Sequence, residues 1–214
     1  MTANLPNSPI SSIIFDLGGV ILNLDYHLTI SEFQKLGMIN STELFSQKSQ
    51  SGFFDDFETG VITADEFRNE VRKEISCAVT DSQIDEAWNA MLLDFPVDRF
   101  TFLQRISSTK RIFLLSNTNQ IHMTWFKNYV NKLFGDNVFF NVFEVAYLSN
   151  EMGMRKPNME IFEYVIRENG LSPKHTLFID DSEQHINGAN QVGLQTYWLQ
   201  PDEEITRLLS NFLA

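Results

Sequence analysis

The sequence predicts an α/β fold in which a doubly wound, mainly parallel sheet carries an inserted group of helices. Short apolar runs, such as residues 13–15 before Asp16 and 177–179 before Asp180, end in polar side chains, which is typical of strands buried on both faces. Segments with helical periodicity lie between most of these runs, and this alternation favours parallel strands joined by helices. A long segment without a strand pattern directly follows the first run, and it indicates an insertion.

The composition is that of a folded, acidic protein. The 214 residues include 19 Phe and are 43% hydrophobic, which is enough for a packed core. A net charge of -12 argues against nucleic acid and anionic membrane as general partners. No apolar stretch approaches the ~20 residues of a membrane span, and the single cysteine, Cys77, cannot form an internal disulfide. We therefore expect a cytoplasmic protein in which Cys77 is a small buried side chain.

The turn after the first strand is a candidate binding element. Asp16 ends a buried run, and a carboxylate there is costly unless something pairs with it. Gly18 and Gly19 let the backbone turn sharply and bring its amides close to a small anion. Ligands of such sheets bind beyond the carboxyl ends of the strands. The alternative is a strand that simply ends in a turn-forming aspartate.

The segment after this turn predicts about four helices. Apolar residues recur there at helical spacing, and Thr63 and Thr80 stand at capping-box spacing before two of the helices. Phe53, Phe54 and Phe57 fit a helix-packing core better than a substrate pocket.

A proline closes the helical segment, because the residue before Pro96 avoids helical geometry. The predicted organisation is an α/β core of residues 1–22 and 96–214 and a helical cap of residues 23–95.

The second half of the chain returns to alternating strands and helices. Strands are predicted at residues 111–116, 138–147, 176–180 and 195–199. Short polar side chains follow the first of these strands, beginning with Ser116 and Asn117, and would suit both a helix N-cap and an anion site.

Four polar segments should meet at one edge of the sheet, where they bring Asp16, Ser116, Lys156, Asp180 and Asp181 together. Adjacent acids at a strand end repel unless a cation lies between them and a neighbour. Carboxylates suit Mg²⁺, a carboxylate can act as a nucleophile, and a lysine and a hydroxyl can neutralise phosphoryl oxygens. This set of side chains therefore indicates phosphoryl transfer.

The sequences FDLGGV, LLSNTN, GMRKP and FIDDS, which carry these residues, resemble the four motifs of the haloacid dehalogenase (HAD) superfamily. They are most similar to the subgroup that contains bacterial sugar-1-phosphate phosphatases and the phosphatase-like domain of soluble epoxide hydrolase. The insertion directly after the first motif resembles the family's helical cap of the first type. The resemblance thus implies a Rossmann-like HAD core with a cap.

The resemblance also implies roles for individual residues. Asp16 would be the nucleophile and a Mg²⁺ ligand, with the Gly18 carbonyl and Asp181 as further ligands. Asp180 would act through a metal-bound water. The implied phosphate-binding residues are Ser116, Asn117 and Lys156, of which Ser116 and Lys156 also take part in catalysis.

The implied function is a Mg²⁺-dependent phosphatase that hydrolyses a small, sugar phosphate-like metabolite through an aspartyl-phosphate intermediate. One alternative is a metal-independent 2-haloacid dehalogenase, against which the adjacent acids count, as does Gly18, because dehalogenases resemble one another in having tyrosine there. The other is a non-catalytic module that binds a phosphorylated metabolite.

Two positions depart from the family pattern. Family phosphatases usually carry a general acid and base at the place of Gly18, although the sugar-1-phosphate phosphatases resemble this chain in having glycine. Asp25 could substitute for that acid or be a solvated turn residue. His185 stands where many relatives have an asparagine or aspartate that supports the lysine and the metal, and a neutral histidine could form a similar hydrogen bond.

Overall fold

The computed structural model describes residues 9–39, 41, 52–75 and 77–210 of the chain. Five strands form one parallel sheet in the order β3-β2-β1-β4-β5. The strands are β1 (Ser12–Phe15), β2 (Arg111–Ser116), β3 (Val145–Leu148), β4 (Thr176–Asp180) and β5 (Gln195–Trp198). Every pair of neighbouring strands is parallel, which confirms the predicted fold class.

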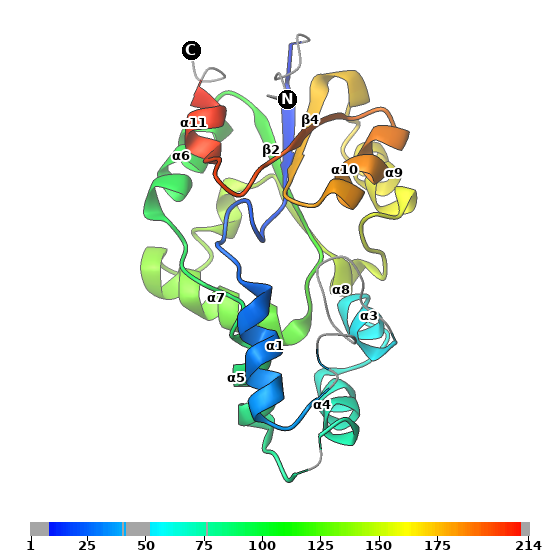
Figure 1. The fold of residues 1–214 in the computed structure, drawn as a ribbon. Coiled ribbons are helices and arrows are strands. Elements are labelled where there is room, and N and C mark those ends of the chain that lie inside the picture. Colours follow the sequence, from blue (N-terminus) through cyan, green and yellow to red (C-terminus); the bar gives the residue numbers. More distant parts are fainter. Residues whose placement is uncertain (1–8, 40, 42–51, 76, 211–214) are drawn as a thin grey trace.

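Helices cover both faces of this sheet. They are α6 (Val97–Ser107), α7 (Gln120–Phe134), α8 (Ser149–Met152), α9 (Met159–Glu168), α10 (Glu183–Gln191) and α11 (Ile205–Leu208), with 3-10 turns at Phe140–Val142 and Pro173–His175. In Figure 1, α6 and α11 lie on one side of the sheet, and α9 and α10 on the other. Successive side chains of β1 point to opposite faces of the sheet. Ile13 and Phe15 belong to the cluster that contains Leu103 of α6, and Ile14 belongs to the cluster that contains Phe162 of α9.

The third strand is shorter than predicted and begins later. Residues 138–147 were expected to be extended, but the strand spans only Val145–Leu148, and Phe140–Val142 forms a 3-10 turn. The prediction was wrong because Phe139 and Phe143 do not belong to a strand. Both are buried in the hydrophobic cluster that also contains Leu103 of α6.

The inserted helices form a second group with its own core. The described helices are α1 (Tyr26–Lys35), α3 (Phe53–Glu58), α4 (Ala64–Lys73) and α5 (Asp81–Asn89), which occupy the lower half of Figure 1. Phe54 and Phe57 pack with Phe67 and Trp88, which confirms that the phenylalanine cluster is packing core. The predicted capping boxes are present at the starts of α4 and α5.

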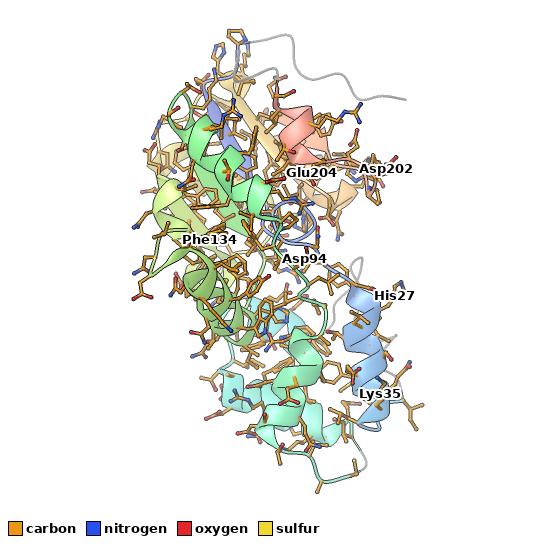
Figure 2. The ribbon with its side chains drawn as sticks, turned by 90° about the vertical axis from the view of Figure 1, so that its left-hand side faces the viewer. His27, Lys35, Asp94, Phe134, Asp202 and Glu204 are labelled. Atoms are coloured by element: carbon orange, nitrogen blue, oxygen red, sulfur yellow. The ribbon has the colours of Figure 1, made fainter. Side chains whose placement is uncertain are left out.

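Two linkers run side by side where the chain enters and leaves this group. Asn23 of the outgoing linker donates its backbone N–H to the Asp94 carbonyl at 3.1 Å, and its side-chain amide donates to the Asp94 carboxylate at 3.0 Å. The buried Arg99 of α6 donates to Asn23 Oδ1 at 2.9 Å and to the Ile21 carbonyl at 3.1 Å, and it pairs with Glu204 of α11. Figure 2 labels Asp94 at this junction, together with His27 and Lys35 on α1. The junction is thus anchored to α6 and, through Glu204, to the start of α11.

Cys77 is exposed, contrary to the expectation of a buried side chain. It lies in the connection between α4 and α5, outside the apolar faces of both helices, and its Sγ is 3.2 Å from the Leu36 carbonyl. None of the helices among the described residues has the length and apolarity of a membrane span.

Gly188 of α10 packs closely against the loop that carries Lys156, and a substitution there tests how tight this packing is. A Cβ at Gly188 would lie 2.2 Å from the Pro157 carbonyl oxygen. We expect Gly188→Ala to destabilise the fold by about 1–2 kcal/mol, because overpacking outweighs the gain in helix propensity. Urea unfolding measures this, and the exposed Asn187→Ala on the same helix is the control, with a change of less than about 0.5 kcal/mol. Unchanged stability of Gly188→Ala would show that α10 can move away from the loop freely.

Candidate active site

The structure brings together the polar residues that the sequence predicted at the strand ends. Asp16 follows β1, Ser116 ends β2 and Asp180 ends β4. The Lys156 Nζ lies 2.9 Å from Asp16 Oδ1 and 2.6 Å from Asp180 Oδ2. Because β1 and β4 are neighbours in register, with Phe15 opposite Ile179, the two carboxylates lie on either side of one ammonium group.

Asn117 fixes the backbone of this lysine. Its side-chain amide donates to the Lys156 carbonyl at 2.8 Å, and the Lys156 N–H donates to Asn117 Oδ1 at 2.9 Å. Asn117 and Ser116 also line the cavity beside Asp16. The loop after β2 therefore both borders the cavity and positions the lysine.

Burial and charge together set the ionisation of Lys156 and Asp180. Burial alone would lower the pKa of Lys156, but Asp16 and Asp180 raise it above its ordinary value. Burial alone would raise the pKa of Asp180, but Lys156 and His185 hold it below its usual range. The lysine is thus cationic and Asp180 anionic, even though neither side chain has any exposed surface.

Asp16 experiences the opposite balance. Burial raises its pKa well above the ordinary value, and the negative charges of Asp180 and Asp181 raise it further, although Lys156 acts in the other direction. A divalent cation between Asp16 and Asp181 would offset this repulsion. The surplus of negative charge therefore fits a metal site.

Which carboxylate oxygens could bind a metal ion directly depends on which of them already accept hydrogen bonds from the protein. Within the described residues, ligand atoms of Asp16, Asp180 and His185 lie within 4.8 Å of one another. However, Asp180 Oδ1 accepts the Ser182 N–H at 2.8 Å and faces His185 Nδ1 at 2.9 Å, and its Oδ2 accepts from Lys156. Both of its oxygens are thus engaged by protein donors, which disfavours a direct bond to a metal.

Asp16, Gly18 and Asp181 line the cavity together. Their oxygens are of the kind that Mg²⁺ prefers. Gly19 has a positive φ of 71°, and a Cβ there would lie 2.3 Å from Asp181 Oδ2. Only glycine allows this carboxylate to approach the turn so closely.

The two departures from the family pattern have different outcomes. Asp25 caps α1 by accepting the His27 N–H at 3.0 Å, and it is not among the residues that line the cavity. Burial lowers the pKa of His185, and its Nδ1 faces a carboxylate that can only accept, so a neutral imidazole donates from Nδ1 to Asp180. His185 thus forms the hydrogen bond expected of a neutral histidine.

Further residues that line the cavity are not among those predicted from the sequence, and they include Tyr26, Glu58, His122 and Arg155. Tyr26 begins α1, and burial together with the charges of Asp181 and Asp16 raises the pKa of its phenol well above the ordinary value. The buried His122 of α7 has a pKa lowered by burial to about 4, and its Nε2 is 3.1 Å from the Trp88 carbonyl. Only Arg155 gave a signal, since it directly precedes Lys156 in the third motif.

Comparison with known proteins identifies the family. A family model described as haloacid dehalogenase-like hydrolase matches residues 127–199. A solved structure of a HAD family enzyme from Bacteroides thetaiotaomicron, a mutant in complex with magnesium and inorganic phosphate, is 38% identical with a TM-score of 0.88, and the match covers 94% of this chain and 98% of that one. The chain belongs to the haloacid dehalogenase-like hydrolase family.

Two further relatives of this HAD-like hydrolase support the assignment. A HAD-like family hydrolase from Porphyromonas gingivalis is 30% identical with a TM-score of 0.84, over 96% of this chain and 98% of that one. The D-ribitol-5-phosphate phosphatase of B. thetaiotaomicron is 28% identical over 220 residues, which cover 94% of this chain and 100% of the relative. The resemblance drawn from the four motifs is therefore confirmed, and the protein is a hydrolase.

The two adjacent acids of this HAD-like hydrolase should differ in their effect on stability. We expect Asp180→Asn to destabilise the fold by about 3 kcal/mol, because it removes one anion from a buried charge pair and leaves Asp16 as the remaining partner of Lys156. Asp181→Asn, whose side chain is only half-buried, should change the free energy of unfolding by less than about 1 kcal/mol. Urea unfolding of both variants in EDTA gives the comparison. Equal losses would contradict the asymmetry between the two carboxylates.

Proposed function

We propose that this HAD-like hydrolase is a Mg²⁺-dependent phosphatase that hydrolyses a small, sugar phosphate-like metabolite through an aspartyl-phosphate on Asp16. The contact between the buried Lys156 and Asp16, which lines a cavity together with Ser116 and Asn117, is the observation that carries the proposal. The named activity of the B. thetaiotaomicron phosphatase and the magnesium and phosphate in the related structure support it.

Asp16 attacks the phosphorus atom and forms an acyl phosphate, while the bond to the leaving oxygen breaks. Lys156 neutralises charge on the phosphoryl oxygens, and the Ser116 hydroxyl donates a hydrogen bond to them. Asn117 lines the phosphate site and holds the Lys156 backbone. Water then cleaves the acyl phosphate and restores the Asp16 carboxylate. Asp16 and Asp180 keep Lys156 cationic and in place, and His185 holds the Asp180 carboxylate by a hydrogen bond.

Asp16, the Gly18 carbonyl and Asp181 would hold Mg²⁺, with Asp180 acting through a metal-bound water. Bound there, the ion would supply positive charge that offsets the repulsion between the carboxylates and the incoming phosphate.

The insertion of residues 23–95 acts in this proposal as a cap over the cavity, with the paired linkers at Asn23 and Asp94 as its boundary. Two of its helices support this role, because α1 brings Tyr26 and α3 brings Glu58 to the cavity. A cap of this kind excludes water and contacts the part of the substrate beyond the phosphate.

The other functions considered from the sequence receive less support. A dehalogenase has no need of the surplus of carboxylates that repel Asp16. A module that only binds a phosphorylated metabolite does not need a buried lysine in contact with Asp16, because exposed cationic side chains would also bind phosphate.

Metal dependence and the nucleophile test the proposal directly. We expect turnover of 4-nitrophenyl phosphate with Mg²⁺, its loss in EDTA, and a decrease of about 10³-fold or more in Asp16→Asn, because removal of the nucleophile eliminates the covalent route. Phosphate release and circular dichroism measure activity and folding. Full activity in EDTA, or an active Asp16→Asn, would exclude the mechanism.

Magnesium titrations of two variants serve as the control. Asp181→Asn should raise the Mg²⁺ concentration that gives half-maximal activity by more than Asp180→Asn does, because Asp180 has both oxygens engaged by protein donors. The reverse order would contradict the ligand assignment.

The absence of an acid at Gly18 predicts a dependence on the leaving group. We expect kcat/KM to fall steeply across phosphate esters as the leaving-group pKa rises, since general acid help is worth ~10²–10⁴ in rate. A Cβ at Gly18 would lie 2.5 Å from Leu24 Cδ1, so Gly18→Asp is best introduced together with Leu24→Ala. That double variant should flatten the dependence relative to Leu24→Ala alone.

If kcat/KM of the wild type does not change with the leaving-group pKa, the prediction is contradicted. It would point to another proton donor, first of all the protonated Tyr26 phenol that lines the cavity.

A further inference from the structure

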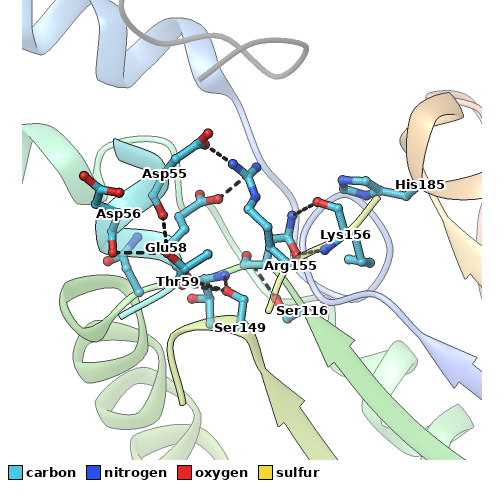
Figure 3. A network of polar contacts seen from close by, with 12 residues as sticks. Asp55, Asp56, Glu58, Thr59, Ser116, Ser149, Arg155, Lys156 and His185 are labelled. Carbon is cyan, nitrogen blue, oxygen red and sulfur yellow. Dashed lines mark hydrogen bonds and ion pairs between the residues drawn. The ribbon is translucent and has the colours of Figure 1, made fainter. Parts of the chain in front are cut away.

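Arg155 and Glu58 form an ion pair between the inserted helices and the sheet. Arg155 Nη2 lies 3.1 Å from Glu58 Oε2, and Arg155 Nη1 pairs with Asp55, one turn earlier on α3. Figure 3 shows the Arg155 side chain directed toward both acids. Arg155 comes from the loop before α9, so the pair joins segments that are about a hundred residues apart in the chain.

The three charged groups differ in where they lie. Glu58 and Arg155 line the same cavity as Asp16 and Ser116, and Asp55 does not. The side chain of Glu58 is 8% exposed and that of Arg155 is 20% exposed, while that of Asp55 is 43% exposed. The inner part of this cluster therefore faces the space beside the nucleophile, and the outer part faces solvent.

The end of α3 that carries Glu58 is fixed to the sheet. The Ser149 hydroxyl donates to the Glu58 carbonyl at 2.6 Å and accepts the Thr118 N–H at 2.8 Å. A Cβ at Gly60 would lie 2.2 Å from the Asn150 carbonyl oxygen, so the chain after α3 also touches the sheet side closely. Glu58 is thus held in position relative to the loop of Asn117 and Thr118, as a binding group must be.

Stability does not account for a desolvated pair in this place. A buried ion pair is often no more stabilising than apolar side chains of similar volume. Arg155 Nε is also buried without a hydrogen-bond partner among the described residues, and a donor in that condition is costly. The guanidinium therefore has donor capacity that the protein leaves unused.

We propose that Glu58 and Arg155 form a subsite that binds the hydroxyl groups of a polyol or sugar phosphate, next to the phosphoryl group. The inference rests on the proposed phosphatase function. A hydroxyl both donates and accepts, so it matches a carboxylate acceptor beside a guanidinium donor. Because Arg155 directly precedes Lys156, the subsite adjoins the residue that contacts Asp16.

Other substrate groups match the pair less well. Glu58, together with Asp16 and Asp181, would repel a second anionic group. An apolar group would desolvate the pair without replacing the hydrogen bonds to water. A site built to hydrogen-bond a hydroxyl strongly rejects the analogue that lacks it.

The test compares polyol and sugar phosphates with n-alkyl phosphates of equal chain length, beginning with D-ribitol 5-phosphate and n-pentyl phosphate. In the wild type, we expect kcat/KM for at least one hydroxylated ester to exceed that of its alkyl match by about a hundredfold. Glu58→Gln and Arg155→Lys should reduce this preference by about tenfold or more, mainly through KM of the hydroxylated ester.

Asp55→Asn is the matched control, because Asp55 pairs with the same guanidinium outside the cavity. It should leave the preference within about twofold of the wild type. A parallel loss for both ester types, or an equal loss in Asp55→Asn, would show that the contact is only structural and overturn the inference.

The inference and the proposed function can fail separately. If 4-nitrophenyl phosphate is hydrolysed with Mg²⁺ but no hydroxylated ester is preferred, the subsite is wrong and the phosphatase stands. If no phosphate ester is hydrolysed, the phosphatase proposal fails and the subsite fails with it.

Discussion

The fully buried ammonium of Lys156 constrains the rest of the structure. A charge without exposed surface is tolerated only when paired and hydrogen-bonded, and here Asp16 and Asp180 supply the anions. Their approach requires β1 and β4 to be parallel neighbours in register, and it requires the loop before α9 to reach back over the sheet edge. Asn117 secures that loop by two hydrogen bonds to the Lys156 backbone. Sheet order, strand ends and loop are therefore all tied to one side chain.

The same arrangement explains how an acidic protein could attract an anionic substrate. The chain has a net charge of -12, and Asp16, Asp180 and Asp181 outnumber Lys156 at the site. Burial and this repulsion raise the pKa of Asp16 and oppose its ionisation, and the repulsion would also oppose the arrival of a phosphate. A divalent cation bound there would offset both effects, which is why the proposed metal and the proposed substrate belong together.

The inserted helices combine a core built mainly from their own side chains with contacts to the rest of the molecule. Their phenylalanine cluster packs around Trp88, and Ile121 of α7 is buried in the same cluster, so most but not all of its apolar burial comes from the inserted helices. Polar contacts also attach it, through His122 with the Trp88 carbonyl, through Ser149 with the Glu58 carbonyl and through Arg155 with Glu58 and Asp55. This division fits a cap that needs its own stability and also a defined position over the cavity.

The sequence by itself determined the features that depend on local chemistry. Apolar runs that end in Asp16, Ser116 and Asp180 marked the strand ends, and four short motifs indicated the family, because strand burial and turn chemistry are encoded in adjacent residues. Only the tertiary structure showed that Tyr26 and Glu58 face the cavity, since the facing of a helix depends on what packs against it. The same reason explains the misplaced third strand, where phenylalanines belong to a cluster formed by distant segments. It also explains Asp25, whose carboxylate caps α1 instead of entering the site.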